Sequence, residues 1–267
     1  MSPDVYTHGH HESVLRSHKW RTAENSAAYL LPALRSGLDL LDVGCGPGTI
    51  TLDLARRIAP GRAVGIDRSP GVIADAQRAA HDAGVTNVEF GMGDVYALDH
   101  PDRCFDIVHA HQVLQHLTDP VAALREMRRV VRADGVVAVR DSDYSGFVWA
   151  PADPRLDRWL ALYLAVTARN GADAQAGRHL LRWAQAAGFT DVSVSTSTWT
   201  FADPDSRAWW GGLWADRVLH SALAEQAVAY ELADAAELAS IADAFRQWAT
   251  ELDGMFVVLH GEVMARR

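Results

Sequence analysis

The feature of the sequence that most constrains the fold is a short apolar run that leads through glycines into an amphipathic segment. The run LDLLDV occupies residues 38–43, Gly44, Gly46 and Gly48 follow it, and TITLDLARRIA occupies residues 49–59. A short apolar run bounded by glycines is typical of a buried strand, and the apolar spacing that follows is typical of a helix. This segment therefore predicts a strand, a tight turn and a helix in immediate succession.

The same alternation continues further along the chain. Strands are expected at 63–67, 87–94, 105–111 and 135–141, and helices at 70–84 and 119–131. Strands that alternate with helices form a parallel sheet covered by helices on both faces. We therefore expect a doubly wound α/β fold that binds its ligand beyond the carboxyl ends of the strands.

The regular alternation is preceded and followed by other segments. A helix in two pieces is expected over 12–35, helices at 153–171 and 176–189, a strand at 190–201, a mostly helical stretch at 204–252 and a last strand at 255–267. These segments predict an N-terminal helical flap over residues 1–36 and one domain over residues 37–267. Two helical insertions in that domain, at about 142–175 and 203–252, are expected to form a lid over a substrate cavity.

Charge and composition narrow the classes of function. The formal net charge is −9 and no run of lysine or arginine marks a basic face, so a nucleic-acid partner is not expected. The chain has no apolar run of the roughly 18 residues that a membrane span needs, and its N-terminus lacks the apolar stretch of a signal peptide. Cys45 and Cys104 are the only cysteines and show no metal-ligand spacing. We therefore expect a cytoplasmic protein with no metal site.

The glycine loop and an acidic residue after the next strand are the parts of a site for an adenosine-containing cofactor. Asp67 lies 23 positions after Gly44, where a carboxylate can accept hydrogen bonds from both hydroxyls of a ribose. An NAD-binding loop has the pattern G-x-G-x-x-G, whereas this loop is G-x-G-x-G and has Thr49 at the place of the third glycine. Asp42 precedes the loop, where its charge would repel a pyrophosphate and attract a cationic amino-acid group.

Four segments in the same order carry a resemblance to a known family. LLDVGCGPGT, VGIDRSP, the GD of GMGDVYAL and FDIVHAHQVLQHL resemble the successive motifs of class I methyltransferases that depend on S-adenosylmethionine. The ubiquinone/menaquinone-type branch, which methylates small molecules, is the most similar. The resemblance covers residues 10–141 well and the remainder only in outline. It implies a seven-stranded sheet whose last strand is antiparallel, a role that residues 255–267 would fill.

The resemblance also implies which residues hold S-adenosylmethionine. Gly44, Cys45 and Gly46 would lie under its methionine part, and Asp42 would approach its amino group. Asp67 would hold the ribose hydroxyls.

On the adenine side, the resemblance places Arg68 beside the ring. Gly93 and Asp94 form the GD motif, with the Asp94 carboxylate accepting the adenine amino group. The backbone N–H of Val95 would donate to a ring nitrogen.

Histidines after the fourth strand are the candidates for proton transfer. By the resemblance, His111 and Gln112 would lie beside the sulfonium, and histidine titrates near neutral pH. His116 is a second candidate base, and packing within a helix explains it equally well. Asp141 and Tyr144 follow the fifth strand, where they can orient the acceptor or simply cap a loop. A general base raises the rate by about 10²–10⁴-fold where the acceptor loses a proton.

The N-terminal segment YTHGHHESVLRSHKWR is rich in histidine. Tyr6 and His10 are candidate substrate contacts on a flap over the cofactor, together with His8, His11 and His18, and a mobile polar tail is the alternative. Arg16 or Arg21 can clamp the carboxylate of S-adenosylmethionine. No acidic cluster accompanies the histidines, so they do not indicate a metal.

Eight of the nine tryptophans lie beyond residue 148. Large apolar surfaces of this kind can line a pocket for an apolar or aromatic small-molecule acceptor, form the core of a lid, or form a homodimer interface. Two other functions stay open at this point: a protein that binds S-adenosylmethionine without methyl transfer, and an NAD-dependent oxidoreductase. The motifs do not identify the acceptor or the atom that is methylated.

Overall fold

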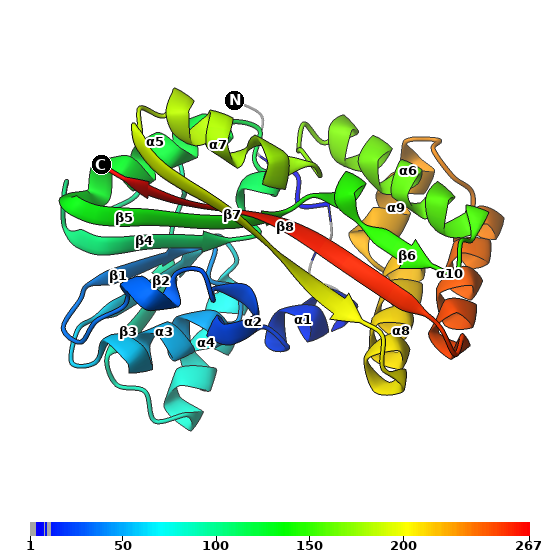
Figure 1. Cartoon of the computed structure of the whole chain (residues 1–267), viewed down its shortest axis with the longest axis horizontal. Helices are drawn as coiled ribbons and strands as arrows, with labels where there is room; N and C mark the ends of the chain where they lie inside the picture. Colours follow the sequence, from blue (N-terminus) through cyan, green and yellow to red (C-terminus); the bar gives the residue numbers. More distant parts are fainter. Residues whose placement is uncertain (1–3, 8, 10–11) are drawn as a thin grey trace.

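The computed structural model describes residues 4–7, 9 and 12–267 and has one mixed sheet at its centre (Figure 1). The strands are β1 (Leu40–Val43), β2 (Ala63–Asp67), β3 (Val88–Met92), β4 (Phe105–His111), β5 (Val131–Ser142), β6 (Val148–Ala150), β7 (Asp191–Phe201) and β8 (Met255–Arg266). Their order is β3-β2-β1-β4-β5-β8-β6, and β7 pairs with β8. Strands β1 to β5 pair in parallel, and β8 runs antiparallel to β5, β6 and β7.

Helices cover both faces of the sheet. The α-helices are α1 (Glu12–Lys19), α2 (Ala23–Ser26), α3 (Thr49–Ile58), α4 (Pro70–Asp82), α5 (Pro120–Val130), α6 (Pro154–Arg169), α7 (Ala176–Ala186), α8 (Pro204–His220), α9 (Ala222–Ala229) and α10 (Ala235–Thr250). Short 3-10 helices are η1 (Leu31–Ala33), η2 (Leu114–His116) and η3 (Tyr144–Gly146). Leu41 and Val137 pack in the core beneath α5 and α7, whereas their neighbours Leu40 and Val136 pack in the core beneath α3. Because side chains alternate between the faces of a strand, this arrangement confirms the doubly wound α/β fold.

The sheet has one strand more than the expected seven. β8 is 12 residues long; β5 and β6 share one of its edges, and β7 pairs along the other. The additional strand is β6, which has only three residues and pairs with the first part of β8. A run of that length shows no periodicity in a sequence, so residues 142–152 gave no sign of it.

Helices α6, α8, α9 and α10 form a helical layer at one end of the molecule, and Figure 1 shows β7 and β8 running out of the central sheet to meet it. The layer has its own apolar core, in which Trp159, Tyr163, Trp214, Phe245 and Phe256 are almost fully buried. None of the eight tryptophans beyond residue 148 is exposed. Most of this aromatic surface therefore packs inside the chain.

Residues 20–35 differ from the helix that the sequence predicted. α1 ends at Lys19, α2 covers only Ala23–Ser26, and a 3-10 turn follows at Leu31–Ala33. The Asn25 carbonyl oxygen accepts a hydrogen bond from Trp199 Nε1 at 2.6 Å, and Pro32 has no backbone N–H to extend a helix. A contact with β7, distant in the sequence, thus interrupts the local periodicity.

Candidate active site

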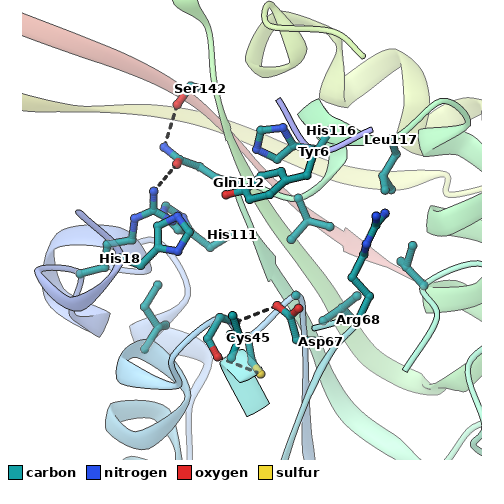
Figure 2. Close-up of a pocket in the computed structure, with 18 of the residues that line it drawn as sticks. Tyr6, His18, Cys45, Asp67, Arg68, His111, Gln112, His116, Leu117 and Ser142 are labelled. Carbon is teal, nitrogen blue, oxygen red and sulfur yellow. Dashed lines mark hydrogen bonds between the residues drawn. The ribbon is translucent and has the colours of Figure 1, made fainter. Parts of the chain in front are cut away.

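The register of the parallel strands brings several strand ends to one edge of the sheet. Val43 at the end of β1 pairs with Ile66 of β2 and with Ala110 of β4, while Asp67 pairs with Met92 of β3. The residues that follow these strands therefore meet where the strand order reverses, between β1 and β4. A cavity of about 790 Å³ opens there (Figure 2). Its volume lies in the upper part of the roughly 300–1,000 Å³ range of ligand sites.

The glycine loop forms one wall of this cavity. Gly44 has a φ of 68° and Gly46 a φ of 56°, a left-handed conformation that favours glycine. A Cβ on Gly44 would clash with a methyl group of Val113. Gly48 begins α3 without a side-chain cap, which leaves the first N–H groups of this helix for a ligand.

Asp67 is fixed at the end of β2 by the loop itself. Its Oδ2 accepts a hydrogen bond from the Gly46 N–H at 3.2 Å, and its Oδ1 accepts one from the Ser69 N–H at 3.0 Å. A carboxylate has about four lone-pair sites, so acceptor capacity remains for a ligand. Figure 2 shows Asp67 beside Cys45, which also lines the cavity.

Asp42 lines the cavity from within the core. It is 2% exposed, accepts a hydrogen bond from the Thr51 hydroxyl at 2.5 Å, and contacts His109 Nδ1 at 2.7 Å. His109 of β4 is itself fully buried and positions the Asp42 carboxylate. A buried carboxylate held from both sides keeps a fixed direction toward the loop.

The remaining predicted cofactor residues lie along the same wall. Gly93, Asp94 and Val95 line the cavity, and Asp94 Oδ1 accepts a hydrogen bond from the Tyr96 N–H at 2.9 Å. Arg68 also lines it and donates to the Asp4 carbonyl oxygen at 3.0 Å.

Gln112 connects several parts of the fold at the centre of the cavity wall. Its φ is 54°, which is uncommon for a residue other than glycine. Its Oε1 accepts a hydrogen bond from Arg21 at 2.6 Å, and its Nε2 lies 2.7 Å from Ser142 Oγ and 2.9 Å from His260 Nε2. Figure 2 shows the bond to Ser142. Burial lowers the pKa of Arg21 to about 10, so this cavity residue stays cationic at neutral pH.

His111 is a buried imidazole at the cavity. It is 6% exposed, and neither ring nitrogen has a hydrogen-bond partner among the described residues. Burial, and then the charges of Arg21 and Arg140, lower its pKa well below the usual value. His111 is therefore neutral at neutral pH and has one nitrogen that can accept a hydrogen bond.

His116 and Tyr6 contact each other edge to face, with ring centroids 4.8 Å apart. Both line the cavity, and in Figure 2 they lie on the side opposite Asp67 and Cys45. Burial, and then the charges of Arg21 and Arg217, lower the pKa of His116 to about 3. Burial raises the pKa of Tyr6 to about 12. Neither side chain is poised to exchange a proton near neutral pH.

The N-terminal segment lies across the cavity. Asp4 Oδ1 accepts hydrogen bonds from the N–H and the hydroxyl of Thr118, at 2.9 and 2.8 Å. His18 lines the cavity, whereas Arg16 lies outside it and forms an ion pair with Asp216 at 2.9 Å. Of the two arginines proposed as a carboxylate clamp, only Arg21 is therefore in position. The predicted contact His10 lies outside the described residues, as do His8 and His11.

Asp141 and Tyr144 are separated by the fold. Tyr144 lines the cavity, whereas Asp141 is fully buried away from it. Asp141 Oδ1 accepts the Gln115 N–H at 3.1 Å, at the start of the turn after β4. Of the two roles expected for Asp141, the geometry favours the capping role, because its carboxyl group accepts a backbone N–H in a turn and does not line the cavity.

Another part of the cavity wall comes from the later half of the chain, and the sequence did not show which of its residues would reach the cavity. They are mostly aromatic side chains and one arginine: Phe147, Trp199, Trp210, Trp214 and Arg217. The last three share one face of α8, at positions that recur every three or four residues. That spacing was visible in the sequence, but nothing local showed which face the helix turns toward the sheet.

The described part of the chain contains neither a cluster of metal ligands nor a membrane-spanning helix. No three His, Cys, Asp or Glu side chains gather there as a metal-ligand set. No described helix combines the length and apolar character that crossing a bilayer requires.

Known proteins resemble this chain in sequence and structure. A family model described as a methyltransferase domain matches residues 34–188. An uncharacterized methyltransferase of Schizosaccharomyces pombe is 33% identical over 98% of this chain and 96% of that protein. A ubiquinone biosynthesis O-methyltransferase of Azorhizobium caulinodans is 38% identical over 39% of this chain and 40% of that protein. The crystal structure of YcgJ from Bacillus subtilis matches with a TM-score of 0.58 and 17% identity, over 91% of this chain and 99% of that one, which shows a common fold.

The family match spans more than half of the chain, and the match to the Schizosaccharomyces protein spans nearly all of it. The site agrees with this assignment. Gly44 passes so close to Val113 that a Cβ would not fit there, and Asp67 keeps acceptor capacity at the end of β2 beside the cavity. These matches select S-adenosylmethionine over NAD as the cofactor. The chain therefore belongs to the class I methyltransferases and is an enzyme that depends on S-adenosylmethionine.

Proposed function

We propose that the methyl acceptor is a small, flat molecule of apolar or aromatic character. The observation that carries the proposal is the continuity of one cavity from the glycine loop to the aromatic side chains of the helical layer. Tyr144, Phe147 and Trp210 line this part of the cavity with aromatic surface, which suits an apolar or aromatic ligand. The net charge of −9 disfavours RNA as the acceptor.

For the cofactor, we propose the roles that the family motifs imply. Asp67 accepts the ribose hydroxyls, and the loop of Gly44, Cys45 and Gly46 supports the methionine part. Asp42 attracts the amino group, and Arg21 binds the carboxylate. When bound, S-adenosylmethionine supplies an electrophilic methyl group. The support for these roles is that all these side chains or loop atoms line one cavity.

At the adenine end, we propose that Asp94 accepts the amino group and that the Val95 N–H donates to the ring. Gly93 keeps this turn close to β2, because a Cβ there would press against Ile66 at 2.9 Å. Arg68 flanks the ring while it holds the N-terminal segment through Asp4.

We propose that His111 orients the acceptor and is not a strong general base. Its neutral imidazole can accept a hydrogen bond from a hydroxyl or N–H group of the acceptor, which aims the nucleophilic atom. Alignment alone can supply on the order of 7–11 kcal/mol in well-oriented reactions. Gln112 lies next to it as part of the wall. His116, with a pKa of about 3, contributes shape rather than proton transfer.

We further propose that residues 1–36 act as a flap and that the insertions at 142–175 and 203–252 act as a lid. The two parts hold each other. Asn170 donates to the Thr7 hydroxyl at 2.9 Å, and Arg217 donates to the Ser17 hydroxyl at 3.0 Å. Closing them over the cavity would exclude water from the transfer step.

The acceptor class can be tested with S-adenosylmethionine that carries a labelled methyl group. The protein is incubated with a cell extract, which is then separated into RNA, protein and an organic-solvent fraction. We expect the unaltered protein to label the organic fraction. Asp67→Ala, the matched control, should leave that fraction unlabelled. Label in RNA or protein, absent in the control, would contradict a small apolar acceptor.

A further inference from the structure

The helical layer places one arginine at the cavity without an acidic partner. Arg217 of α8 is 5% exposed and lines the cavity. Its Nη2 donates to Ser17 Oγ at 3.0 Å and to the Ser13 carbonyl oxygen at 3.3 Å, and its guanidinium carbon lies 4.7 Å from the centre of the Trp214 ring. Its Nε has no hydrogen-bond partner among the described residues. These contacts are all to neutral groups.

The nearest acid in the sequence does not compensate this charge. Asp216 pairs with Arg16 at 2.9 Å, and its side chain is 45% exposed. The groups that favour the charged form of Arg217 are Tyr144, Tyr6 and Tyr163. Burial raises the pKa of each of these tyrosines, so they are uncharged at neutral pH. Within the described chain, Arg217 is a buried cation without a counter-ion.

Burying a charge without a partner is unfavourable, and proteins keep such groups mainly where function needs them. Burial lowers the pKa of Arg217, which reflects this cost. An anionic ligand in the cavity would offset the cost of burying this charge. A guanidinium donates a charge-assisted hydrogen bond to a carboxylate oxygen, and the N–H group at Nε of Arg217 has no partner among the described residues.

The surroundings of Arg217 indicate what the anion is attached to. Trp214 and Trp210 lie one and two turns earlier on α8, and both line the cavity. Tyr144, stacked on Phe147 with ring centroids 4.5 Å apart, also lines it. A flat conjugated body can pack among these rings while its acidic end reaches the guanidinium.

The cofactor has a different candidate for its own carboxylate. Arg21 donates to Gln112, and the next residue, Val113, packs against Gly44 of the glycine loop. Arg217 is instead bound to Ser13 and Ser17 of α1. The two buried arginines therefore suit two different anions.

We propose that Arg217 binds a carboxylate of the acceptor, so that the substrates are aromatic or conjugated carboxylic acids. This inference rests on the aromatic acceptor site proposed above. It makes Arg217 a specificity-determining residue that touches the substrate away from the reacting atom.

The test compares two ligands of the same shape and different charge. trans-Cinnamate and trans-cinnamamide are titrated calorimetrically into the protein saturated with S-adenosylhomocysteine. We expect cinnamate to bind about tenfold more tightly or better, the size of one charge-assisted hydrogen bond. Arg217→Met should remove the preference, and Arg217→Lys should keep part of it. Arg246→Met, an exposed arginine of the same layer, is the matched control and should keep all of it.

The carboxylate site at Arg217 and the aromatic acceptor site can fail separately in this test. Equal binding of both ligands to the unaltered protein would contradict the carboxylate site and leave the aromatic site standing. Failure of both to bind would contradict both. A preference that survives in Arg217→Met, or that is lost in Arg21→Met instead, would also contradict the role of Arg217. Titration of S-adenosylhomocysteine into each variant shows whether the cofactor end is intact, and we expect no change with Arg217→Met.

Discussion

The side chain of Arg21 donates a 2.6 Å hydrogen bond to Gln112, which joins the N-terminal segment to the end of β4. Gln112 also contacts Ser142 at the end of β5 and His260 of β8. Its left-handed backbone, with a φ of 54°, is held by these contacts. One amide group thus fixes Arg21, the cation assigned to the cofactor carboxylate.

Replacing Gln112 tests this arrangement. Gln112→Ala removes the acceptor that orients Arg21. Glutamine and alanine both have a Cβ, so the backbone strain at position 112 is unchanged. We expect affinity for S-adenosylmethionine to fall about tenfold, the size of one lost charge-assisted hydrogen bond. Calorimetric titration measures it. Gln185→Ala on the exposed side of α7 is the control and should bind normally; equal affinity in both variants would contradict the role of Gln112.

The glycine loop can be tested with a paired substitution. Gly44→Ala puts a Cβ at a φ of 68° and against Val113, so it should lower stability by about 1–2 kcal/mol or more and remove cofactor binding. Gly212→Ala lies inside α8 with open space around it, and should raise stability by about 0.5–1 kcal/mol. Thermal unfolding and cofactor titration measure both effects. Normal cofactor binding by Gly44→Ala would show that the ligand does not need this loop.

The buried histidines should make the protein less stable at acidic pH. Burial lowers the pKa of His111, His116 and His260, to about 3 for His116. In the unfolded chain these groups titrate near pH ~6.5. Below that pH the unfolded state binds more protons, so the free energy of unfolding falls, by up to about 1.4 kcal/mol per pH unit for each histidine. Denaturant unfolding across the acid range should show this loss, and His116→Gln should reduce its slope. An unchanged slope in that variant would contradict a neutral buried His116.

Asp141 should make the stability of the fold depend on pH in the opposite direction. Burial raises its pKa to about 8, so the folded state holds this proton at neutral pH while the unfolded state releases it near pH ~3.9. Between these values the folded state binds more protons, and stability falls as the pH rises toward about 8. Asp141→Asn removes this dependence. Its stability relative to the unaltered protein should therefore improve with rising pH across that window, and a constant difference would contradict a neutral Asp141.

The sequence predicted which residues would lie beside the glycine loop, because their positions depend on local strand ends. Gly44 directly follows β1, and Asp67 and His111 are the last residues of β2 and β4. Parallel strands carry such residues to one edge of the sheet. Asp141 lies in the last part of β5, yet its carboxyl group accepts the Gln115 N–H in the turn after β4. Position at a strand end therefore brings a residue near the site but does not decide where its side chain points.

The acceptor end could not be predicted in the same way. Arg217 reaches the cavity because α8 packs against α1, which lies about two hundred residues earlier in the chain. Trp199 of β7 likewise donates a hydrogen bond to the Asn25 carbonyl oxygen, near the end of α2. Contacts between such distant segments depend on the packing of the whole helical layer, and no local pattern encodes them.

The most direct test of the account is a calorimetric titration of S-adenosylmethionine into the unaltered protein, Asp67→Ala, and Asp82→Ala as an exposed acidic control on the following helix. We expect the unaltered protein and Asp82→Ala to bind S-adenosylmethionine. Asp67→Ala should bind it about a hundredfold more weakly, the size of two hydrogen bonds to a charged group. Unchanged affinity in Asp67→Ala, or tighter binding of NAD than of S-adenosylmethionine by the unaltered protein, would contradict the assignment of the cofactor to the glycine loop.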